Sequence, residues 1–241
     1  KNDFSITIDN KKICFNAVFI AIHGTPGEDG KLQGYFDLLK LPYNTCDVVT
    51  SAITFNKHFC KKIVKPLGVF TAKSITLYKE YRVDVDAILS QISLPCIVKP
   101  NNGGSSVATS RVDTPEQLLP AIKIGFTEDK ELLIEEFIKG VEVTNGCYYA
   151  KGEIHVLPIT EIVTGNSFFD YEAKYQGKSE EVTPARISSE MEALIKKTTA
   201  HIYKHTNCKG MVRMDYIIQD NKPYFLEINT VPGLSEQSII P

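Results

Sequence analysis

The chain has 241 residues, 43% of them apolar and 23% charged, with a formal net charge of −2. These values are ordinary for a globular protein, so they exclude a disordered chain and give no basic surface for nucleic acid. No apolar run is long enough to span a membrane, and the N-terminal residues lack the pattern of a signal peptide. Six cysteines without CxxC spacing indicate free thiols in a reducing cytoplasm rather than a zinc site. We therefore expect a cytoplasmic protein with neither nucleic-acid nor membrane partners.

The first fifty residues show the pattern of an α/β fold. Residues 17–22 form a continuous apolar run, which predicts a strand buried on both faces of a parallel sheet. A turn-rich loop follows at 23–30, and apolar residues at helical spacing predict a helix over 32–39. Loops that follow a strand in this way are where α/β folds bind ligands. Residues 1–50 are therefore predicted to be an N-terminal α/β domain.

The middle of the chain, residues 51–134, is predicted to be a compact α+β subdomain. Its first helix is expected over 51–67, with Gly68 as the stop signal. The elements expected after it are strands at 74–77 and 96–99 around a helix at 83–92, a glycine-rich loop at 101–106, a strand at 107–112 and a helix at 114–126. Thr114 is the expected N-cap of the last helix, because Pro115 follows it at the first helical position.

Residues 135–241 are rich in strand patterns and are predicted to form a second α+β subdomain. The expected elements are strands at 132–136, 141–150 and 154–162, a polar loop at 164–181, a helix at 189–206, and a hairpin of strands at 210–218 and 224–229. The long polar loop contains several aromatic residues. Ordered loops of this length are often lids over an active site, so we predict a lid.

Four polar residues on the final hairpin give the most specific signal. Alternate residues of a strand point to the same face. The side chains of Arg213 and Asp215 should therefore point to one face of their strand, and those of Glu227 and Asn229 to one face of the next. An Asp, a Glu and an Asn that converge supply the oxygen ligands that Mg²⁺ prefers, particularly beside phosphate. The alternative is a surface salt-bridge ladder involving Arg213. If Asp215 and Glu227 lie side by side, the turn must have an odd length, most simply residues 220–222.

Three further features are weaker. Lys99 ends an apolar strand and either reaches solvent or faces a phosphate, and the glycine-rich loop after it favours the phosphate. Glu135 and Glu142 either read the base and ribose of a nucleotide or are solvated carboxylates of an edge strand. His23, at the end of the first predicted strand, either binds a ligand or is a structural histidine.

Seven strings, in a fixed order, carry a resemblance to a known family. They are HGTPGEDGKLQG (23–34), IVKP (97–100), GSS (104–106), LIE (133–135), FDYEAKY (169–175), RMD (213–215) and LEINTVPG (226–233). Together they resemble the D-alanine–D-alanine ligase family of the ATP-grasp superfamily. The resemblance implies an ATP-grasp fold, with mixed α/β and α+β structure, in which two α+β subdomains clasp ATP. It also implies that the N-terminal α/β domain before them, residues 1–50, is truncated and partial Rossmann-like.

The resemblance also implies roles for particular residues. Nucleotide-binding roles fall to Lys57, Lys99, Glu135, Ile138, Glu142, Phe168 and Lys174. Two Mg²⁺ ions, which Mn²⁺ can replace, are expected at Asp215, Glu227 and Asn229. Catalytic roles are implied for His23, Ser105, Tyr175, Arg213 and Gly233, and D-alanine is expected to contact His23, Arg213, Gly233 and Ser238.

The implied activity is ATP-dependent joining of two D-alanines through an acyl phosphate, for peptidoglycan synthesis, by a homodimer. The alternatives are an ester-forming D-alanine–D-lactate ligase or another ATP-grasp ligase, and a nucleotide-binding module without turnover. Tyr175 favours the amine over D-lactate, since ester-forming relatives tend to carry His there. The family's N-terminal glycine-rich strand–loop with its glutamate has no counterpart before Lys1, nor has the helix after the Gly233 loop. We therefore expect the natural protein to extend beyond both ends.

Overall fold

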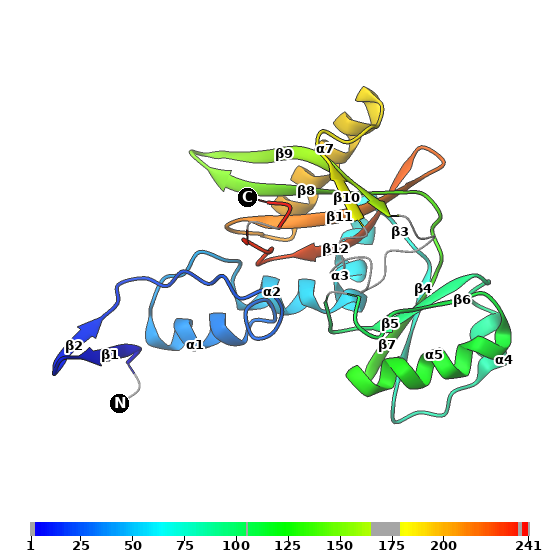
Figure 1. Ribbon diagram of the computed structural model, residues 1–241, viewed down its shortest axis with the longest axis horizontal. Helices are drawn as coiled ribbons and strands as arrows, with labels where there is room; N and C mark the ends of the chain where they lie inside the picture. The colour runs from blue at the N-terminus through cyan, green and yellow to red at the C-terminus, as the bar shows by residue number, and fades with distance from the viewer. Residues whose placement is uncertain (1–2, 105, 165–178, 236–237, 241) are drawn as a thin grey trace.

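The computed structural model of the chain describes residues 3–104, 106–164, 179–235 and 238–240. Two sheets with helices packed on them form most of the molecule (Figure 1). One is antiparallel, and the other is antiparallel except for one pair of strands. Helices α2 (Val48–Phe55) and α3 (Lys57–Val64) lie between the two sheets and pack against strand β12 (Lys222–Asn229). Among the helices of the described ranges, none combines the length and the apolar character that a membrane span requires.

The smaller sheet has four strands and belongs to the middle of the chain. Its order is β4 (Ser74–Tyr78), β7 (Glu131–Glu136), β5 (Cys96–Pro100) and β6 (Ser110–Val112), all antiparallel. Helices α4 (Val85–Leu89) and α5 (Pro115–Glu128) cover one face over a core that includes Val98, Leu118 and Leu132. Burying such side chains stabilises the unit by about 1.5–3 kcal/mol each.

Two of its elements test the expected boundaries. Thr114 and Gln117 form a capping box at the start of α5, so the predicted start of that helix is confirmed. The strand expected over 107–112 is wrong in its first half. Ser106 and Ala108 have φ values of 55° and 52°, which fit a turn and not a strand, so β6 begins only at Ser110.

The larger sheet has six strands. Its order is β10 (Ser179–Val182), β9 (Glu153–Thr164), β8 (Val141–Ala150), β11 (Val212–Gln219), β12 and β3 (Phe70–Thr71), with only the β12–β3 pair parallel. Helix α7 (Ser189–His205), capped by Ser188, packs on β8 and β9 and buries Ile195 completely. The polar loop expected over 164–181 was too long, because β9 and β10 include its two ends.

The β11–β12 hairpin shows the predicted pairing of Asp215 with Glu227, but its turn differs from the predicted one. Asp215 does lie opposite Glu227, as predicted. The turn, however, is the two-residue pair Asp220 and Asn221, whose φ values of 50° and 57° are those of a type I′ turn, so the odd-length turn was wrong. A bulge at Leu226 restores the parity, because Tyr216 pairs with Phe225 and the extra residue is absorbed there.

The single helix predicted over 51–67 is also wrong. Asn56 has extended dihedral angles (φ −82°, ψ 106°), closes α2 and accepts a hydrogen bond from the Phe59 amide as the N-cap of α3. A short 3₁₀ helix, η1 (Lys65–Leu67), then leads to Gly68, which ends the segment as predicted. The break places Lys57 in the first turn of a new helix rather than in the middle of a long one.

The apolar run at 17–22 does not form the buried parallel strand that its composition predicts. Val18 makes a single parallel bridge to Tyr43, while Phe19 is 71% exposed. The side chain of Asn44 accepts a hydrogen bond from the Ile20 amide at 2.7 Å and donates one to the Ile20 carbonyl at 3.3 Å, in place of a neighbouring strand. Around this run lie α1 (Lys31–Leu39), which packs Phe36 against Ile20, and a hairpin of β1 (Ser5–Ile8) and β2 (Lys11–Cys14).

Candidate functional site

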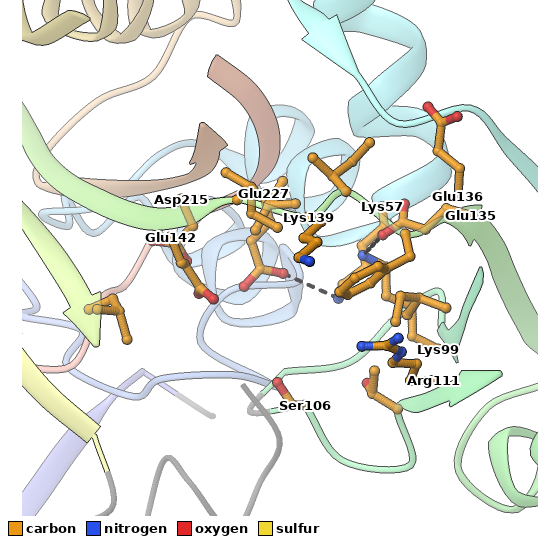
Figure 2. Close-up of a pocket in the computed structure, with 18 of the residues that line it drawn as sticks. Lys57, Lys99, Ser106, Arg111, Glu135, Glu136, Lys139, Glu142, Asp215 and Glu227 are labelled. Atoms are coloured by element: carbon orange, nitrogen blue, oxygen red, sulfur yellow. Dashed lines mark hydrogen bonds and ion pairs between the residues drawn. The ribbon is translucent and has the colours of Figure 1, made fainter. Parts of the chain in front are cut away.

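A cavity of about 1000 Å³ is lined by residues of both the smaller and the larger sheet (Figure 2). From the smaller sheet and its loops come Lys99, Glu135 and the glycine-rich segment with Gly103 and Gly104. From the larger sheet come Glu142, Asp215 and Glu227. Residues far apart in the sequence therefore surround one space, and its volume is at the upper end of the range for small-molecule sites.

One wall of the cavity is apolar. Ile97, Phe137, Ile138 and Leu226 line it, and Leu226 joins Glu227 there although the two are consecutive in the chain. Consecutive strand residues normally point to opposite faces, and the bulge at Leu226 explains why both reach the cavity. Arg111 lies 4.4 Å from the centre of the Phe137 ring, so this wall combines flat apolar surface with a cation. Such a wall suits a planar aromatic group.

Glu135 is a buried carboxylate held by two lysines. Lys61 of α3 contacts Oε2 at 2.6 Å, and Lys99 of β5 contacts Oε1. Burial by itself raises the pKa of Glu135, but Lys99 and Lys61 together lower it to about 2. Burial also lowers the pKa of Lys61, because the lost hydration of the ammonium outweighs the attraction of Glu135. The predicted alternative of a solvated edge carboxylate does not apply to Glu135, which is 5% exposed.

Lys57 joins the glycine-rich loop to the larger sheet. Its ammonium donates to the Gly103 carbonyl and lies 3.5 Å from the Glu227 carboxylate (Figure 2). The Lys57 amide donates to the Asn101 carbonyl at 3.1 Å, which fixes the start of α3 beside this loop. Lys57 therefore lies between the glycine-rich loop and Glu227, and its contact with ATP phosphates stays a prediction.

Three of the four hairpin residues form a buried network. Arg213 donates to both oxygens of Asp215, at 2.9 and 3.0 Å, and the Asn229 amide donates to Asp215 Oδ2 at 3.0 Å. Thr144, opposite Asp215 on β8, donates to Oδ1. Arg213, Asp215 and Asn229 are each less than a tenth exposed, so the alternative of a surface salt-bridge ladder is excluded. Burial lowers the pKa of Arg213, but the nearby carboxylates of Asp215, Glu227 and Glu28 raise it by more than burial lowers it. The net pKa lies above the ordinary value, so the guanidinium stays charged.

The donors present fit a hard divalent cation. Asp215 and Glu227 lie opposite each other and both line the cavity, and Asn229 is two residues along the same strand. Carboxylate and amide oxygens are the ligands that Mg²⁺ uses, generally together with phosphate and water. In the described part of the chain, no group of three or more His, Cys, Asp or Glu gathers as a complete protein cage. The Asp, Glu and Asn oxygens are therefore chemically suited to a hard divalent cation.

A second cluster lies where the loop at 23–30 meets the end of β12. Glu28, 4% exposed, accepts the Val231 amide at 2.8 Å and the Gly24 amide at 2.7 Å. His23 Nδ1 lies 2.9 Å from the Val231 carbonyl and 3.1 Å from Glu28. Gly27 is required by close approach, since a β-carbon there would lie 1.9 Å from the Ile22 carbonyl oxygen. His23 thus has structural partners and also lies beside the loop that leads to Gly233.

Gly233 and Ser238, both of which the resemblance implies contact D-alanine, lie next to each other. A β-carbon at Gly233 would lie 2.6 Å from Ser238 Oγ, so any other residue there would require that hydroxyl to move. Ser238 Oγ also accepts the Ser235 amide at 3.2 Å. His23, Arg213, Asn229, Gly233 and Ser238 do not line the cavity, but Arg213 connects their neighbourhood to it through Asp215. The predicted site residues Ser105, Phe168, Lys174 and Tyr175 lie outside the described residues.

Three residues of the site were not predicted from the sequence. Lys61 was hidden in the expected helix, although its position four residues after Lys57 places both on one face of α3. Glu28 stood in the quoted loop string without a role. Thr144 lies two residues after Glu142 on β8, the spacing that turns a strand residue to the same face.

We expect Glu28→Gln to weaken the hold on His23. Glu28 raises the pKa of His23 by its hydrogen bond, against the effect of burial. With a neutral amide there, the His23 pKa should fall, as followed by NMR of the imidazole carbons across pH. The imidazolium–carboxylate pair stabilises the fold fully below the ordinary pKa of 6.5 and loses this effect as pH rises through the raised pKa. His201 and His205 serve as internal controls, and an unchanged His23 titration would contradict the assignment.

The two sheets around a nucleotide-sized cavity are those of the ATP-grasp class of ligases. A family profile described as "D-ala D-ala ligase C-terminus" matches residues 63–241, and "D-ala D-ala ligase N-terminus" matches residues 1–46. The chain belongs to the D-alanine–D-alanine ligase family. The fold and family predicted from the sequence are confirmed.

Similar proteins agree on this. The chain is 50% identical over 241 residues to a D-alanine–D-alanine ligase of Flavobacterium johnsoniae, covering all of this chain and 75% of that protein. Among solved structures, the VanG D-Ala:D-Ser ligase of Enterococcus faecalis is 34% identical with a TM-score of 0.86, over 96% of this chain and 68% of that one. A Bacillus anthracis D-alanine–D-alanine ligase complexed with ATP is 30% identical with a TM-score of 0.81, over 94% and 72%.

Proposed function

We propose that this protein joins two D-alanines in an ATP-dependent ligase reaction that supplies the dipeptide for peptidoglycan. The observation that carries the proposal is the pairing of Asp215 with Glu227 at the edge of the cavity, with Arg213 bonded to Asp215 behind them. A non-catalytic nucleotide-binding module does not require a buried charged network of this kind, because burying charges costs free energy. The network therefore favours turnover over simple binding.

The cavity divides into parts that match a nucleotide. The apolar wall with Ile138 would hold the base beside Glu135, and Glu142 would accept from the ribose. Lys57, Lys99 and the glycine-rich loop line one part of the cavity and would hold the phosphates there. We include Phe168 and Lys174 in the same site. Two Mg²⁺ ions, or Mn²⁺, held by Asp215, Glu227 and Asn229 would neutralise charge on the phosphoryl oxygens when bound.

The first step activates a carboxylate, which is otherwise a poor acyl donor. An oxygen of the first D-alanine's carboxylate attacks the γ-phosphorus, the bond to the β–γ bridging oxygen breaks, and ADP leaves with an acyl phosphate formed. Lys57 and Lys99 stabilise the negative charge that spreads over the transferred group. His23, held by Glu28 and Val231, and Ser105 position this substrate. Tyr175, on the expected lid, would exclude water from the acyl phosphate.

The second step forms the peptide bond. The ammonium of the second D-alanine loses one proton to solvent, and its nitrogen attacks the acyl carbon. The carbon–oxygen bond to phosphate then breaks, and the nitrogen gives its second proton to the leaving phosphate or to solvent. Negative charge builds on the carbonyl oxygen, where Arg213 and the Gly233 amide would stabilise it as an oxyanion site. Ser238, beside Gly233, would hold the second substrate. The likeness to a D-Ala:D-Ser ligase makes D-serine a second candidate for this position.

We further propose that the chain divides into an N-terminal domain, residues 1–50, and two ATP-grasp subdomains, residues 51–134 and 135–241. Strand β7 ends two residues past the second boundary. A cytoplasmic homodimer is the proposed state of the protein. Both follow from the family and the sequence pattern.

The decisive experiment offers ATP and D-alanine, with D-serine or D-lactate as competing second substrates. We expect phosphate release that depends on D-alanine, and mass spectrometry should find D-alanyl-D-alanine as the main product. ADP formation without a dipeptide would favour another ligase, whereas nucleotide binding with no ADP formation would favour a binding module. An ester as the main product would instead identify the D-lactate alternative.

A further inference from the structure

Lys61 and Lys99 hold the same buried carboxylate from two sides. Lys99 takes Glu135 Oε1 and lines the cavity, whereas Lys61 takes Oε2 at 2.6 Å and does not line it. The side chain of Lys61 is 9% exposed, that of Glu135 7% and that of Lys99 14%. Lys61 therefore lies behind Glu135, on the side away from the space for the nucleotide.

The arrangement of α3 explains how Lys61 reaches this position. Lys57 and Lys61 are one helical turn apart on α3, and both are buried. Asn101 fixes the start of the helix by accepting the Lys57 amide through its carbonyl and the His58 amide through its side chain. The same helix face thus presents one lysine toward Glu227 and the next toward Glu135.

A nucleotide changes the balance of charge around Glu135. If Lys99 binds a phosphate, its ammonium must weaken or break its contact with Oε1. Glu135 is then compensated mainly by Lys61. A buried carboxylate that lost all compensation would be strongly disfavoured, and would take up a proton or turn away. Lys61 does not line the cavity, so its contact with Oε2 does not have to break when Lys99 turns to a phosphate.

We infer that Lys61 is a positioning residue that keeps Glu135 ionised and oriented while Lys99 transfers to the nucleotide phosphates. Released Oε1 then accepts a hydrogen bond from the exocyclic amine of adenine. Lys61 thereby sets base selectivity without touching the nucleotide. The inference rests on the proposed function, because it needs a purine nucleotide in the cavity.

The test compares Lys61→Met with Lys61→Arg. Lys62→Met is the control, because Lys62 is the next residue on α3 and is exposed. Calorimetric titration measures the affinity for Mg–ADP and for Mg–IDP, whose base carries a carbonyl oxygen in place of the amine. We expect Lys61→Met to weaken ADP binding about tenfold to a hundredfold and to reduce the ADP-over-IDP preference. KM for ATP should rise more than kcat falls. Lys61→Arg should restore most of the preference, and Lys62→Met should match the unmodified protein.

Thermal unfolding of each variant shows whether it folds, and Lys61→Gln replaces Lys61→Met if the methionine variant does not. Unchanged ADP affinity and unchanged ADP-over-IDP preference in a folded Lys61 variant would overturn the inference alone. If the unmodified protein bound neither nucleotide, the proposed function itself would fail, and the inference with it.

Discussion

Ligase turnover of the Glu227→Gln variant is expected to fall by roughly 10³-fold, and Mg–ADP affinity should fall with it. Glutamine keeps the shape of the side chain but removes the negative charge. Glu227 lies opposite Asp215, lines the cavity and faces Lys57 at 3.5 Å. In the proposed site, one carboxylate would therefore serve both the cation and the lysine that binds phosphate. The measurement is phosphate release over a Mg²⁺ titration, together with calorimetric titration of ADP.

Glu153→Gln, at the exposed start of β9, is the matched control and should behave like the unmodified protein. Near-normal turnover of Glu227→Gln at saturating Mg²⁺ would show that the metal assignment is wrong. A loss of turnover with full nucleotide affinity would place Glu227 in the chemical step only.

Replacing Arg213 with methionine should reduce both stability and activity. Arg213 makes two hydrogen bonds to buried Asp215, and removing one partner of such a pair costs about 3–5 kcal/mol of unfolding free energy. Loss of the proposed oxyanion contact should reduce kcat by about 10²–10³-fold. Urea unfolding without metal gives the first quantity, and dipeptide formation under conditions where the variant is folded gives the second.

Arg213→Lys separates the two effects. Lysine keeps the charge near Asp215 but lacks the planar fork that contacts both oxygens, so it should recover more stability than activity. If Arg213→Met unfolded like the unmodified protein and kept its turnover, neither the buried pair nor the oxyanion role would stand.

The sequence was most informative where a strand pattern fixed direction. The spacing of Arg213 with Asp215 and of Glu227 with Asn229 predicted that they converge, and the register confirms that Asp215 faces Glu227. The same reasoning failed for the turn, because it assumed a regular ladder. A bulge changes the parity of a hairpin with no distinct signal in composition, and Leu226 gives none.

Long-range partners were the other limit. Whether an apolar run becomes a buried strand depends on a neighbouring strand, and residues 17–22 have instead the side chain of Asn44 and one bridge to Tyr43. Lys61 and Glu135 are 74 residues apart, so the spacing on α3 could suggest a shared face but not the carboxylate that Lys61 meets. The helix break at Asn56 was missed because asparagine is tolerated within helices as well as at their caps.

The contacts of Val231 have a consequence for which sequences this site tolerates. Its amide donates to Glu28 and its carbonyl lies at His23, so the main chain and not the side chain of residue 231 holds the 23–30 loop. Its own side chain packs beside Ile20 and Phe36. Evolution can therefore exchange this valine for another apolar residue of similar size and leave the hold on the loop intact. Proline is the exception, since it has no amide hydrogen to donate to Glu28.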